Sequence, residues 1–367
     1  MAKKICIISP AAYPILTGSD EPRSGGGAEA QLCVLGRGLA EEGYEVHYIV
    51  DDFGQPQDQK LGDVYIHKAP LRYMGGNNLY LFPDWLNYLS VLSRVDADYH
   101  VIKLPRNLLV PLGVFCKIRN RRLIFIGQID NDVDLRFIRE NEGVVTYWLY
   151  RIGMKAVDFI VAQNERQREG FERLFRKRTR MVKSIITLPT VGEIKKKNYV
   201  LWVGSALEKK KPLTFIELAR AMPDICFKMA VAPVDEELDN RLRAEACKLP
   251  NLEYLGFVPL AKISRYFSEA ALFVSTSIRE GFPNTFLQSW QFGTPVVSLS
   301  VDPDDLIQNN ALGRLSRTFE QLCSDVDEIM NNPELRREFG ENGRNYVYAN
   351  HSKDVIIPQY LNILKCL

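Results

Sequence analysis

Short apolar runs alternate with longer segments of helical periodicity along this chain, and the alternation begins twice. In the first half, the apolar runs lie at residues 4–9, 45–50, 64–67, 100–103, 123–126 and 159–162. The first helical pattern covers residues 28–42. Continuous apolar strands separated by helices indicate a parallel sheet that is covered on both faces.

The second half repeats this pattern from residue 199 onward. Its apolar runs lie at residues 199–204, 226–230, 252–256, 272–275 and 295–299. Its helical patterns lie at residues 212–221, 236–248, 263–269, 286–292, 333–347 and 355–364. We therefore predict an α/β protein with two doubly wound, Rossmann-like domains.

The boundary between the predicted domains falls near residue 190. Residues 189–197 contain Pro, Gly and three consecutive lysines without apolar periodicity, which is typical of a linker. The predicted domains are residues 1–190 and 198–349. We expect the last helix, about residues 350–367, to cross back onto the first domain.

Composition and charge exclude several classes of protein. With 367 residues, 46% hydrophobic, the chain can bury two cores without a metal or disulfide staple. Its 47 basic and 45 acidic residues leave a net charge of +2, which gives no reason to expect nucleic acid as a partner. The seven scattered cysteines contain no Cys-x-x-Cys pair and are typical of reduced core thiols.

Membrane spans and secretion signals are absent from the sequence pattern. No apolar run approaches the roughly 18 residues that a membrane span needs. The run at residues 5–8, which stops before Pro10, is too short for the core of a signal peptide. We expect a cytoplasmic protein that can touch the inner face of a membrane.

A glycine loop, Ser24 to Glu29, lies between the first predicted strand and helix. Glycines let a ligand approach the backbone, and a helix start favours an anion such as phosphate. The loop could equally be a flexible connection. The dinucleotide-binding pattern Gly-x-Gly-x-x-Ala fits residues 25–30, with Asp51 or Asp52 after the next strand. That pattern requires its glycines directly after the first strand. Here residues 10–24 intervene.

The segment richest in polar residues with no packing role follows the run at residues 272–275. Residues 277–288 read SIREGFPNTFLQ, at the carboxyl end of a predicted strand, where open α/β sheets bind ligands. Gly281 permits a sharp turn, and Pro283 suits the first position of a helix. The amides of residues 284–286 would then point toward a ligand. Glu280 and Gln288 could both bind its hydroxyl groups. A capped amphipathic helix is the alternative.

This segment resembles the signature of retaining glycosyltransferases of the GT-B fold, family-4 type (glycosyl transferases group 1). That signature is Glu-Gly-Phe-Pro with a second Glu eight residues after the first. Residues 26–29, 204–211, 255–258 and 289–297 match further motifs of the family. The resemblance spans nearly the whole chain and is strongest from 199 to 300. It implies two Rossmann-like domains facing across a cleft that closes around a nucleotide sugar.

The resemblance also implies roles for individual residues. Glu280 and Lys210 are the implied catalytic residues, with Glu280 on the hydroxyls of the donor sugar and Lys210 on the diphosphate. On the acceptor side it implies Glu29, Gln128 and Asp130. The implied donor-binding residues are Gly26, Gly27, Gly204, Ser205, Lys210, Phe257, Val258, Gly281, Phe282, Pro283, Asn284, Thr285 and Gln288.

The chain departs from the family at several of these positions. Gln288 replaces the second Glu, which in the family binds ribose hydroxyls, and Ser205 replaces an Arg. The family's active-site histidine in the first domain is absent, and Gln128 or Asp130 lies where it is expected. Because lysines flank Lys210 on both sides, the phosphate-binding lysine could be displaced by one position.

Cleavage of a sugar–phosphate bond builds negative charge on the departing diphosphate, which a metal or fixed cations must stabilise. An Asp-x-Asp sequence at residues 130–132 is short enough to occur by chance. We therefore predict no metal and no cofactor. The substrate would be a UDP- or GDP-linked sugar, transferred with retention to a glycan or lipid-linked acceptor in polysaccharide biosynthesis. The alternatives are a nicotinamide-dependent oxidoreductase and a sugar-nucleotide-binding protein without turnover, the latter suggested by Gln288 and Ser205.

A basic surface on the first domain suggests a membrane partner. Residues 166–183 hold eight basic and two acidic residues, and Lys117, Arg119, Arg121 and Arg122 form a second cluster. Phe171, Leu174 and Phe175 have helical spacing within the first cluster. Such a face could rest on anionic lipid, although a solvated helix with a packed stripe would look the same.

Overall fold

The structure is a computed structural model that describes residues 2–19, 26–69, 81–103, 105–189 and 199–367. It divides into two compact units. Unit 1 comprises Met1–Ile185 and Lys353–Leu367, and unit 2 comprises Ile186–Ser352. Most of the predicted linker and the first glycine of the glycine loop, Gly25, lie outside the described residues.

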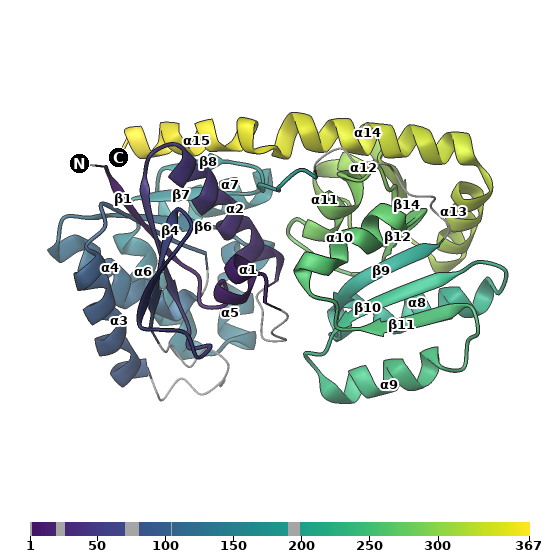
Figure 1. The fold of residues 1–367 in the computed structure, drawn as a ribbon, viewed down its shortest axis with the longest axis horizontal. Helices are drawn as coiled ribbons and strands as arrows, with labels where there is room; N and C mark the ends of the chain where they lie inside the picture. The colour runs from purple at the N-terminus through teal and green to yellow at the C-terminus, as the bar shows by residue number, and fades with distance from the viewer. Residues whose placement is uncertain (1, 20–25, 70–80, 104, 190–198) are drawn as a thin grey trace. The chain divides into compact units, whose positions relative to one another are not determined.

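Unit 1 is built on an eight-stranded sheet with the order β3-β4-β2-β1-β5-β6-β7-β8 (Figure 1). All neighbouring strands are parallel except β3 and β4, which are antiparallel. The sequence order of the parallel strands reverses between β1 and β5. The strands are β1 (Lys4–Ile8), β2 (Glu45–Val50), β3 (Asp58–Leu61), β4 (Val64–Lys68), β5 (Tyr99–Ile102), β6 (Arg122–Ile126), β7 (Phe159–Ala162) and β8 (Thr179–Met181).

Helices cover both faces of this sheet, and each face has its own core. On one face, β1 and β2 pack with α1 (Tyr13–Thr17), α2 (Gly27–Glu41) and the C-terminal α15 (Lys353–Lys365). The close approach of α15 needs a glycine in α2, because a Cβ at Gly38 would lie 2.4 Å from Cδ1 of Ile357. The other face carries α3 (Leu81–Val95), α4 (Leu109–Ile118), α6 (Val144–Ala156) and α7 (Glu165–Phe175). The remaining elements of unit 1 are η2 (Arg106–Leu108), η3 (Asp130–Val133) and α5 (Leu135–Asn141).

Unit 2 contains a six-stranded, fully parallel sheet with the order β11-β10-β9-β12-β13-β14. This is the doubly wound order, and the reversal of sequence order falls between β9 and β12. The strands are β9 (Val200–Ser205), β10 (Phe227–Ala232), β11 (Leu252–Gly256), β12 (Leu272–Ser275), β13 (Val296–Ser298) and β14 (Gly313–Leu315).

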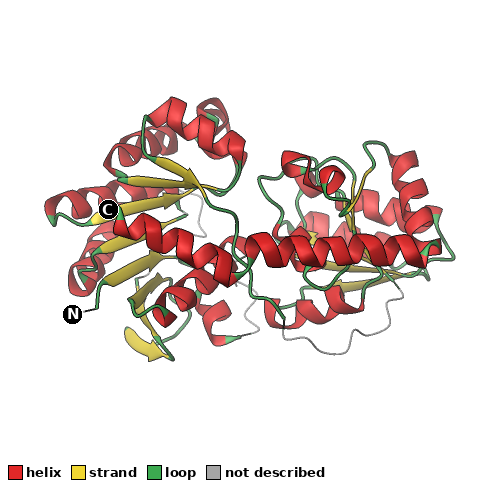
Figure 2. Ribbon diagram, turned by 90° about the horizontal axis from the view of Figure 1, so that it is seen from above, coloured by secondary structure: helices red, strands yellow, loops and turns green. Residues whose placement is uncertain are grey.

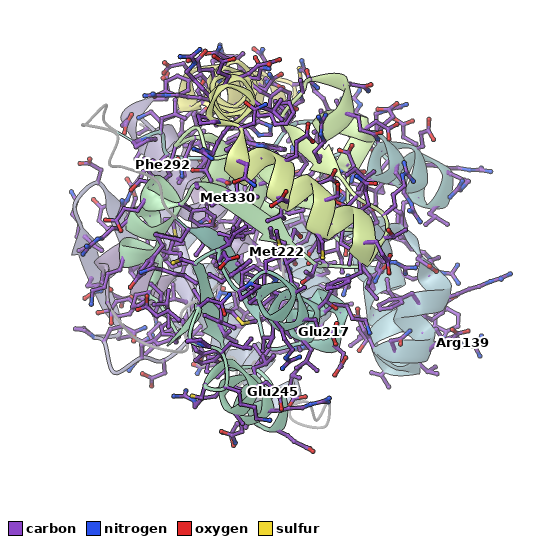
Figure 3. All side chains as sticks on the ribbon, turned by 90° about the vertical axis from the view of Figure 1, so that its right-hand side faces the viewer. Arg139, Glu217, Met222, Glu245, Phe292 and Met330 are labelled. Carbon is purple, nitrogen blue, oxygen red and sulfur yellow. The ribbon has the colours of Figure 1, made fainter. Side chains whose placement is uncertain are left out.

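The helices of unit 2 also pack on both faces of its sheet, as Figure 2 shows with helices in red and strands in yellow. One core is closed by α8 (Pro212–Ala221), α9 (Glu236–Ala246) and α13 (Phe319–Asn331). In Figure 3, Glu217 marks α8 and Glu245 marks α9. The opposite core is closed by α10 (Leu260–Glu269), α11 (Asn284–Trp290), α12 (Leu306–Asn309) and α14 (Pro333–His351). Two short 3-10 turns are η4 (Glu208–Lys210) and η5 (Pro303–Asp305).

The predicted pattern left out several observed elements, among them the helices α3, α4, α6 and α13 and the strands β8 and β14. The strand predicted at residues 100–103 ends at Ile102, and the helix predicted at 286–292 spans Asn284–Trp290. The predicted pattern omitted β3, whose sequence DQKL is polar and half-exposed because it pairs on one side only. Within the described residues, no helix is long and apolar enough to cross a membrane.

Candidate functional site

The two predicted catalytic residues of unit 2 follow the two central strands of its sheet. Lys210 follows β9, and Glu280 follows β12. These strands are neighbours, and the sequence order of the sheet reverses between them. In open α/β sheets, this reversal leaves a crevice beyond the carboxyl ends of the strands, which is where ligands bind.

A tight lysine turn follows β9. Residues Glu208–Lys210 form the 3-10 turn η4, and Lys211 adopts a left-handed backbone with φ of 47°. Pro212 then occupies the first position of α8, where a missing N–H costs nothing. The turn presents three consecutive lysines, of which Lys209 and Lys211 are exposed and Lys210 is half-buried.

The loop after β12 is bonded directly to the lysine turn. The hydroxyl of Thr276 donates to the carbonyl oxygen of Lys210 over 2.7 Å, and the N–H of Ile278 donates to that of Lys209 over 3.0 Å. Thr276 is fully buried and accepts a hydrogen bond from Nε1 of Trp202 over 3.0 Å. These three bonds fix the position of the turn relative to the loop.

Lys210 and Glu280 form an ion pair between Nζ and Oε1. Their side chains keep 23% and 15% of their exposed area, so both groups can meet a ligand from solution. The sequence left open which of the three lysines faces the loop, and in the structure it is Lys210. An ammonium and a carboxylate side by side can bind an anion and a set of hydroxyl groups.

Gly204, the last residue but one of β9, leaves room for the indole of Trp202. A Cβ at Gly204 would lie 2.6 Å from the indole ring of Trp202. A larger residue would displace the indole that hydrogen-bonds Thr276. Ser205 follows Gly204 as the last residue of β9 and is half-buried.

The segment after Glu280 departs in part from its predicted geometry. Gly281 is buried and Phe282 is half-buried, with its ring 5.4 Å from that of His351. Pro283 is the N-cap of α11, with φ of −68° and ψ of 114°, and so does not occupy the predicted first helical position.

The three amides predicted to face a ligand are likewise not equivalent. The N–H of Phe286 donates to the carbonyl oxygen of Pro283 over 3.0 Å, so this amide is already satisfied. Asn284 and Thr285 open α11 and are half-buried. Gln288 is the fifth residue of the helix and is also half-buried.

Phe257 and Val258 lie beyond the edge strand β11, which β10 separates from β9. Gly256 ends that strand with φ of 64°, and both following residues are half-buried. Val258 packs against the core beneath α10 and α11. They therefore line the same carboxyl edge of the sheet as Gly204 and Ser205.

In unit 1, the described glycines of the glycine loop stand at the start of a long helix. Gly26 is the N-cap of α2 without a side-chain cap, and Gly27 is the first helical residue. Glu29 lies in the first turn, where burial raises the pKa of its carboxyl above the usual value. Helix α1 stands between β1 and this loop, so the tight strand-to-helix turn of a dinucleotide site is not present.

Gln128 and Asp130 lie after β6, in a tightly bonded turn. The N–H groups of Gln128 and Ile129 donate to Asp132, which is buried and paired with Arg106. Asp130 accepts from the side-chain amide of Asn164 over 2.9 Å. The Asp-x-Asp sequence at residues 130–132 therefore serves to hold the turn. Among the residues that the structure describes, no group of three or more His, Cys, Asp or Glu side chains could hold a metal.

One buried polar cluster of unit 1 was not predicted. Nζ of Lys103 donates to Oε1 of Gln31 over 2.6 Å, and Nε2 of Gln163 donates to the same oxygen over 3.0 Å. All three side chains are buried, and burial lowers the pKa of Lys103 to about 8. Lys103 directly follows β5 at the reversal of strand order. A lysine that ends an apolar run was the available sequence signal.

Comparisons with known proteins show what this chain is similar to. Residues 187–346 match the family described as Glycosyl transferases group 1. An uncharacterized glycosyltransferase of Haemophilus influenzae is 21% identical over 361 residues, covering 93% of this chain and 97% of that protein.

Two solved structures match over the full length of the chain. The sucrose-phosphate synthase of Thermosynechococcus elongatus has a TM-score of 0.78 at 16% identity, covering 99% of this chain and 98% of that one. HepE of Anabaena, solved in complex with UDP and glucose, has a TM-score of 0.74 at 15% identity and covers 100% of both chains. These likenesses confirm the predicted fold class, the GT-B arrangement of two Rossmann-like domains.

Proposed function

We propose that this chain, whose residues 187–346 match the family Glycosyl transferases group 1 and whose fold is that of GT-B proteins, transfers a sugar from a nucleotide diphosphate to a glycan or lipid-linked acceptor. We propose further that the sugar keeps its anomeric configuration and that no metal ion takes part. The single observation that carries this proposal is the ion pair of Lys210 and Glu280 at the reversal of strand order in unit 2.

In the proposed mechanism, Lys210 stabilises the departing diphosphate. Cleavage of the bond between the sugar and the phosphate leaves additional negative charge on the nucleotide, and a preorganised cation lowers the barrier. A charge-assisted hydrogen bond contributes about 1.5–3 kcal/mol. The side chain of Lys210 supplies such a bond, and the opening residues of α11, Asn284 and Thr285, are the proposed polar neighbours of the phosphates.

Glu280 has a separate role in this proposal. Its carboxylate would accept hydrogen bonds from the hydroxyl groups of the donor sugar and fix the orientation of the reacting carbon. In the free protein the same carboxylate neutralises Lys210. A bound diphosphate would take over that role, which would leave Glu280 available to the sugar.

The remaining donor contacts are proposed from the same edge of the sheet. Gly204 and Ser205 would meet the phosphates, and Gln288 would bind the ribose hydroxyls. Phe257 and Val258 would lie beside the base. Support for a nucleotide donor comes from the similarity to HepE, which binds UDP and glucose.

The acceptor would be bound by unit 1. The proposed contacts are Glu29, Gln128 and Asp130, together with the buried cluster of Lys103, Gln31 and Gln163. Lys103 has only neutral side chains as its hydrogen-bond partners within this cluster, so the amine can interact with an incoming hydroxyl or acidic group. Gly26 and Gly27 would allow a ligand to approach the start of α2 closely.

Gln288 and Ser205 favour a second candidate function, a protein that binds nucleotide sugars without turning them over. Each replaces a charged residue of the family with a neutral one. A neutral glutamine still donates and accepts hydrogen bonds, so binding would persist while stabilisation of the transition state would fall. The two candidates differ in turnover alone.

The test is a thermal-shift panel followed by a turnover assay. UDP, GDP, ADP and their sugars are each added to the protein in the presence of EDTA, with NAD as the control. We expect one nucleotide diphosphate to raise the melting temperature and NAD to have no effect. Release of that nucleotide from its sugar would favour the transferase, whereas binding without release would favour the second candidate. Stabilisation by NAD alone would overturn both.

A further inference from the structure

The outer faces of two neighbouring helices in unit 1 expose large apolar side chains. On α6, Val145, Trp148 and Ile152 are 53%, 52% and 51% exposed. On α4, Val114 and Ile118 are 52% and 77% exposed. We call these five residues the apolar patch. Side chains of this size are normally buried in cores, so a continuous exposed group points to an interaction surface.

Helix α6 has two apolar faces. One is buried in the core, and the other carries three residues of the apolar patch. Tyr150, Gly153 and Met154 point inward and are buried. Val145, Trp148 and Ile152 recur at helical spacing on the opposite side, where a helix at the surface of a globular unit normally carries polar residues. Packing within unit 1 therefore does not account for them.

Two glycines allow α4 and α6 to pack closely against each other. A Cβ at Gly153 of α6 would lie 2.4 Å from Cβ of Leu109 in α4. A Cβ at Gly113 of α4 would lie 2.5 Å from Cβ of Ala156 in α6. The two helices therefore pack directly against each other, as their adjacent positions in Figure 1 also indicate, and we take their exposed residues together as one patch.

The charged residues of these two helices are all basic. Lys117, Arg151 and Lys155 lie in α4 and α6, which contain no Asp or Glu. The guanidinium of Arg151 lies 5.3 Å from the ring centre of Trp148, so a cation directly flanks the exposed indole. Arg119 follows α4 and is exposed. The patch thus combines apolar side chains with a positive rim.

The basic cluster that the sequence offered for membrane contact has a different character. On α7, Phe171 is fully buried and packs edge-on against Phe125 at 5.9 Å, while Phe175 packs against the same core. The apolar stripe of α7 is therefore part of the fold. Its exposed side chains are charged, with acidic Glu165, Glu169 and Glu172 beside basic Arg166 and Arg173, and they lack an apolar anchor.

We propose that the apolar patch on α4 and α6 docks unit 1 on an anionic lipid bilayer. The apolar side chains would enter the interface between headgroups and acyl chains, where tryptophan is favoured. The lysines and arginines around them would lie against lipid phosphates. None of the five residues is among the proposed donor or acceptor contacts, so the inference does not depend on the proposed transfer reaction.

Charge also argues against a second copy of the chain as the occupant. In a two-fold dimer the same patch meets itself, so the like charges of Arg151 and Lys155 would be brought together, whereas Lys117 already pairs with Asp158 over 2.9 Å. An anionic bilayer matches both parts of the surface. The occupant we infer is therefore a lipid surface with negative headgroups.

The test is co-sedimentation of the full chain with vesicles. One set contains phosphatidylcholine alone, and the other contains phosphatidylcholine with phosphatidylglycerol. We expect sedimentation with the anionic vesicles only, falling as salt rises above about 0.15 M. We also expect a blue shift of tryptophan emission, because Trp148 is exposed while Trp202 and Trp290 are buried.

Matched variants assign the effect to the patch. The double variant Trp148→Ser, Ile152→Ser should lose at least tenfold in partitioning and should lose the blue shift. The double variant Arg151→Glu, Lys155→Glu should lose binding to anionic vesicles. Val234→Ser, at an equally exposed apolar site of unit 2, and Arg173→Glu on α7 should change neither readout.

Four results would overturn the proposal. They are no sedimentation of the wild type with anionic vesicles, equal sedimentation with both sets, unchanged binding of the Trp148→Ser, Ile152→Ser variant, and loss of binding in Arg173→Glu alone. Light scattering of the same samples adds an independent check. A wild-type dimer that Trp148→Ser dissociates would identify a second copy as the occupant instead. Because the substituted side chains are exposed, circular dichroism should show native folding in every variant.

Discussion

Lys210 and Glu280, 70 positions apart in the chain, form an ion pair at the carboxyl edge of the sheet in unit 2. The pair is held in place by backbone contacts on both sides, because the loop after β12 bonds the carbonyl oxygens of Lys209 and Lys210. Both side chains are partly exposed, so a ligand can displace Glu280 from Lys210 or Lys210 from Glu280. The predictions below follow from this arrangement.

Lys210→Met should lower the turnover of the nucleotide-sugar donor at least tenfold, because a charge-assisted contact of about 1.5–3 kcal/mol to the departing diphosphate is lost. The measurement is kcat/KM for release of the nucleotide. Lys209→Met is the matched control, since Lys209 is exposed in the same turn and its backbone contacts do not involve its side chain. Equal losses in the two variants would contradict the assignment of Lys210.

Glu280→Gln should separate binding from turnover. Removal of the carboxylate frees Lys210 from its partner, so the free nucleotide diphosphate should bind about two- to fivefold more tightly, as expected for a partly exposed ion pair. Turnover of the sugar donor should nevertheless fall more than tenfold. Calorimetry gives the first quantity and nucleotide release the second. Weaker nucleotide binding together with normal turnover would contradict both expectations. Glu208→Gln, in the lysine turn η4, is the control and should change neither quantity.

Thr276→Val should loosen the lysine turn. The substitution keeps the size of the side chain but removes the donor to Lys210 and the acceptor for the buried N–H of Trp202. We expect about 1–3 kcal/mol less stability in urea unfolding and roughly three- to tenfold lower turnover. Thr276→Ser retains the hydroxyl and should restore both. A loss of stability with unchanged turnover would remove Thr276 from the account of the site.

Gln288→Glu should strengthen nucleotide binding, and Gln288→Ala should weaken it. A carboxylate accepts hydrogen bonds from ribose hydroxyls more strongly than an amide does, and a gain of about 1 kcal/mol corresponds to roughly fivefold in affinity. The two substitutions of Gln288 should change the affinity for the nucleotide in opposite directions, so each variant serves as the control for the other. Calorimetry with the selected nucleotide is the measurement, and equal affinities in all three proteins would place Gln288 outside the site.

Acid stability should depend on His100, which is fully buried in unit 1 and has no hydrogen-bond partner at either ring nitrogen among the described residues. Burial lowers the pKa of His100 to about 3. Below the usual pKa of 6.5 the unfolded chain binds a proton that the folded chain does not. Stability should therefore fall as the pH decreases from about 6.5 toward 3, by about 1.4 kcal/mol per pH unit from this group.

The measurement for His100 is the free energy of unfolding in urea across this pH range. His100→Leu should flatten the dependence, whereas Cys116→Ala, which perturbs the same core without removing a proton site, should leave its slope unchanged. If His100→Leu and the wild type keep the same slope, His100 is not the titrating group.

Much of the fold could be predicted because buried parallel strands are apolar along their whole length. Residues 123–126 and 272–275 are examples, and both lie in strands. Strand β3 could not be predicted in this way. It is a polar edge strand, held by antiparallel pairing with β4 rather than by burial, and such pairing leaves no apolar run in the sequence.

The candidate site was predictable as a set of residues but not as a geometry. The sequence marked Lys210 and Glu280, yet it could not decide among three consecutive lysines, because the choice depends on contacts to Thr276 and Ile278, 66 and 69 positions away from their partners. Lys103 was hidden for a related reason. It ends an apolar run like any strand terminus, and only the fold brings it to Gln31 and Gln163.

Calorimetric titration of the selected nucleotide diphosphate in EDTA, with the wild type and with Lys210→Met, tests the central claim most directly. We predict that the wild type binds the nucleotide without a divalent ion and that Lys210→Met binds it at least tenfold more weakly. Equal affinities for the two proteins would contradict the claim, as would wild-type binding that appears only when manganese is restored.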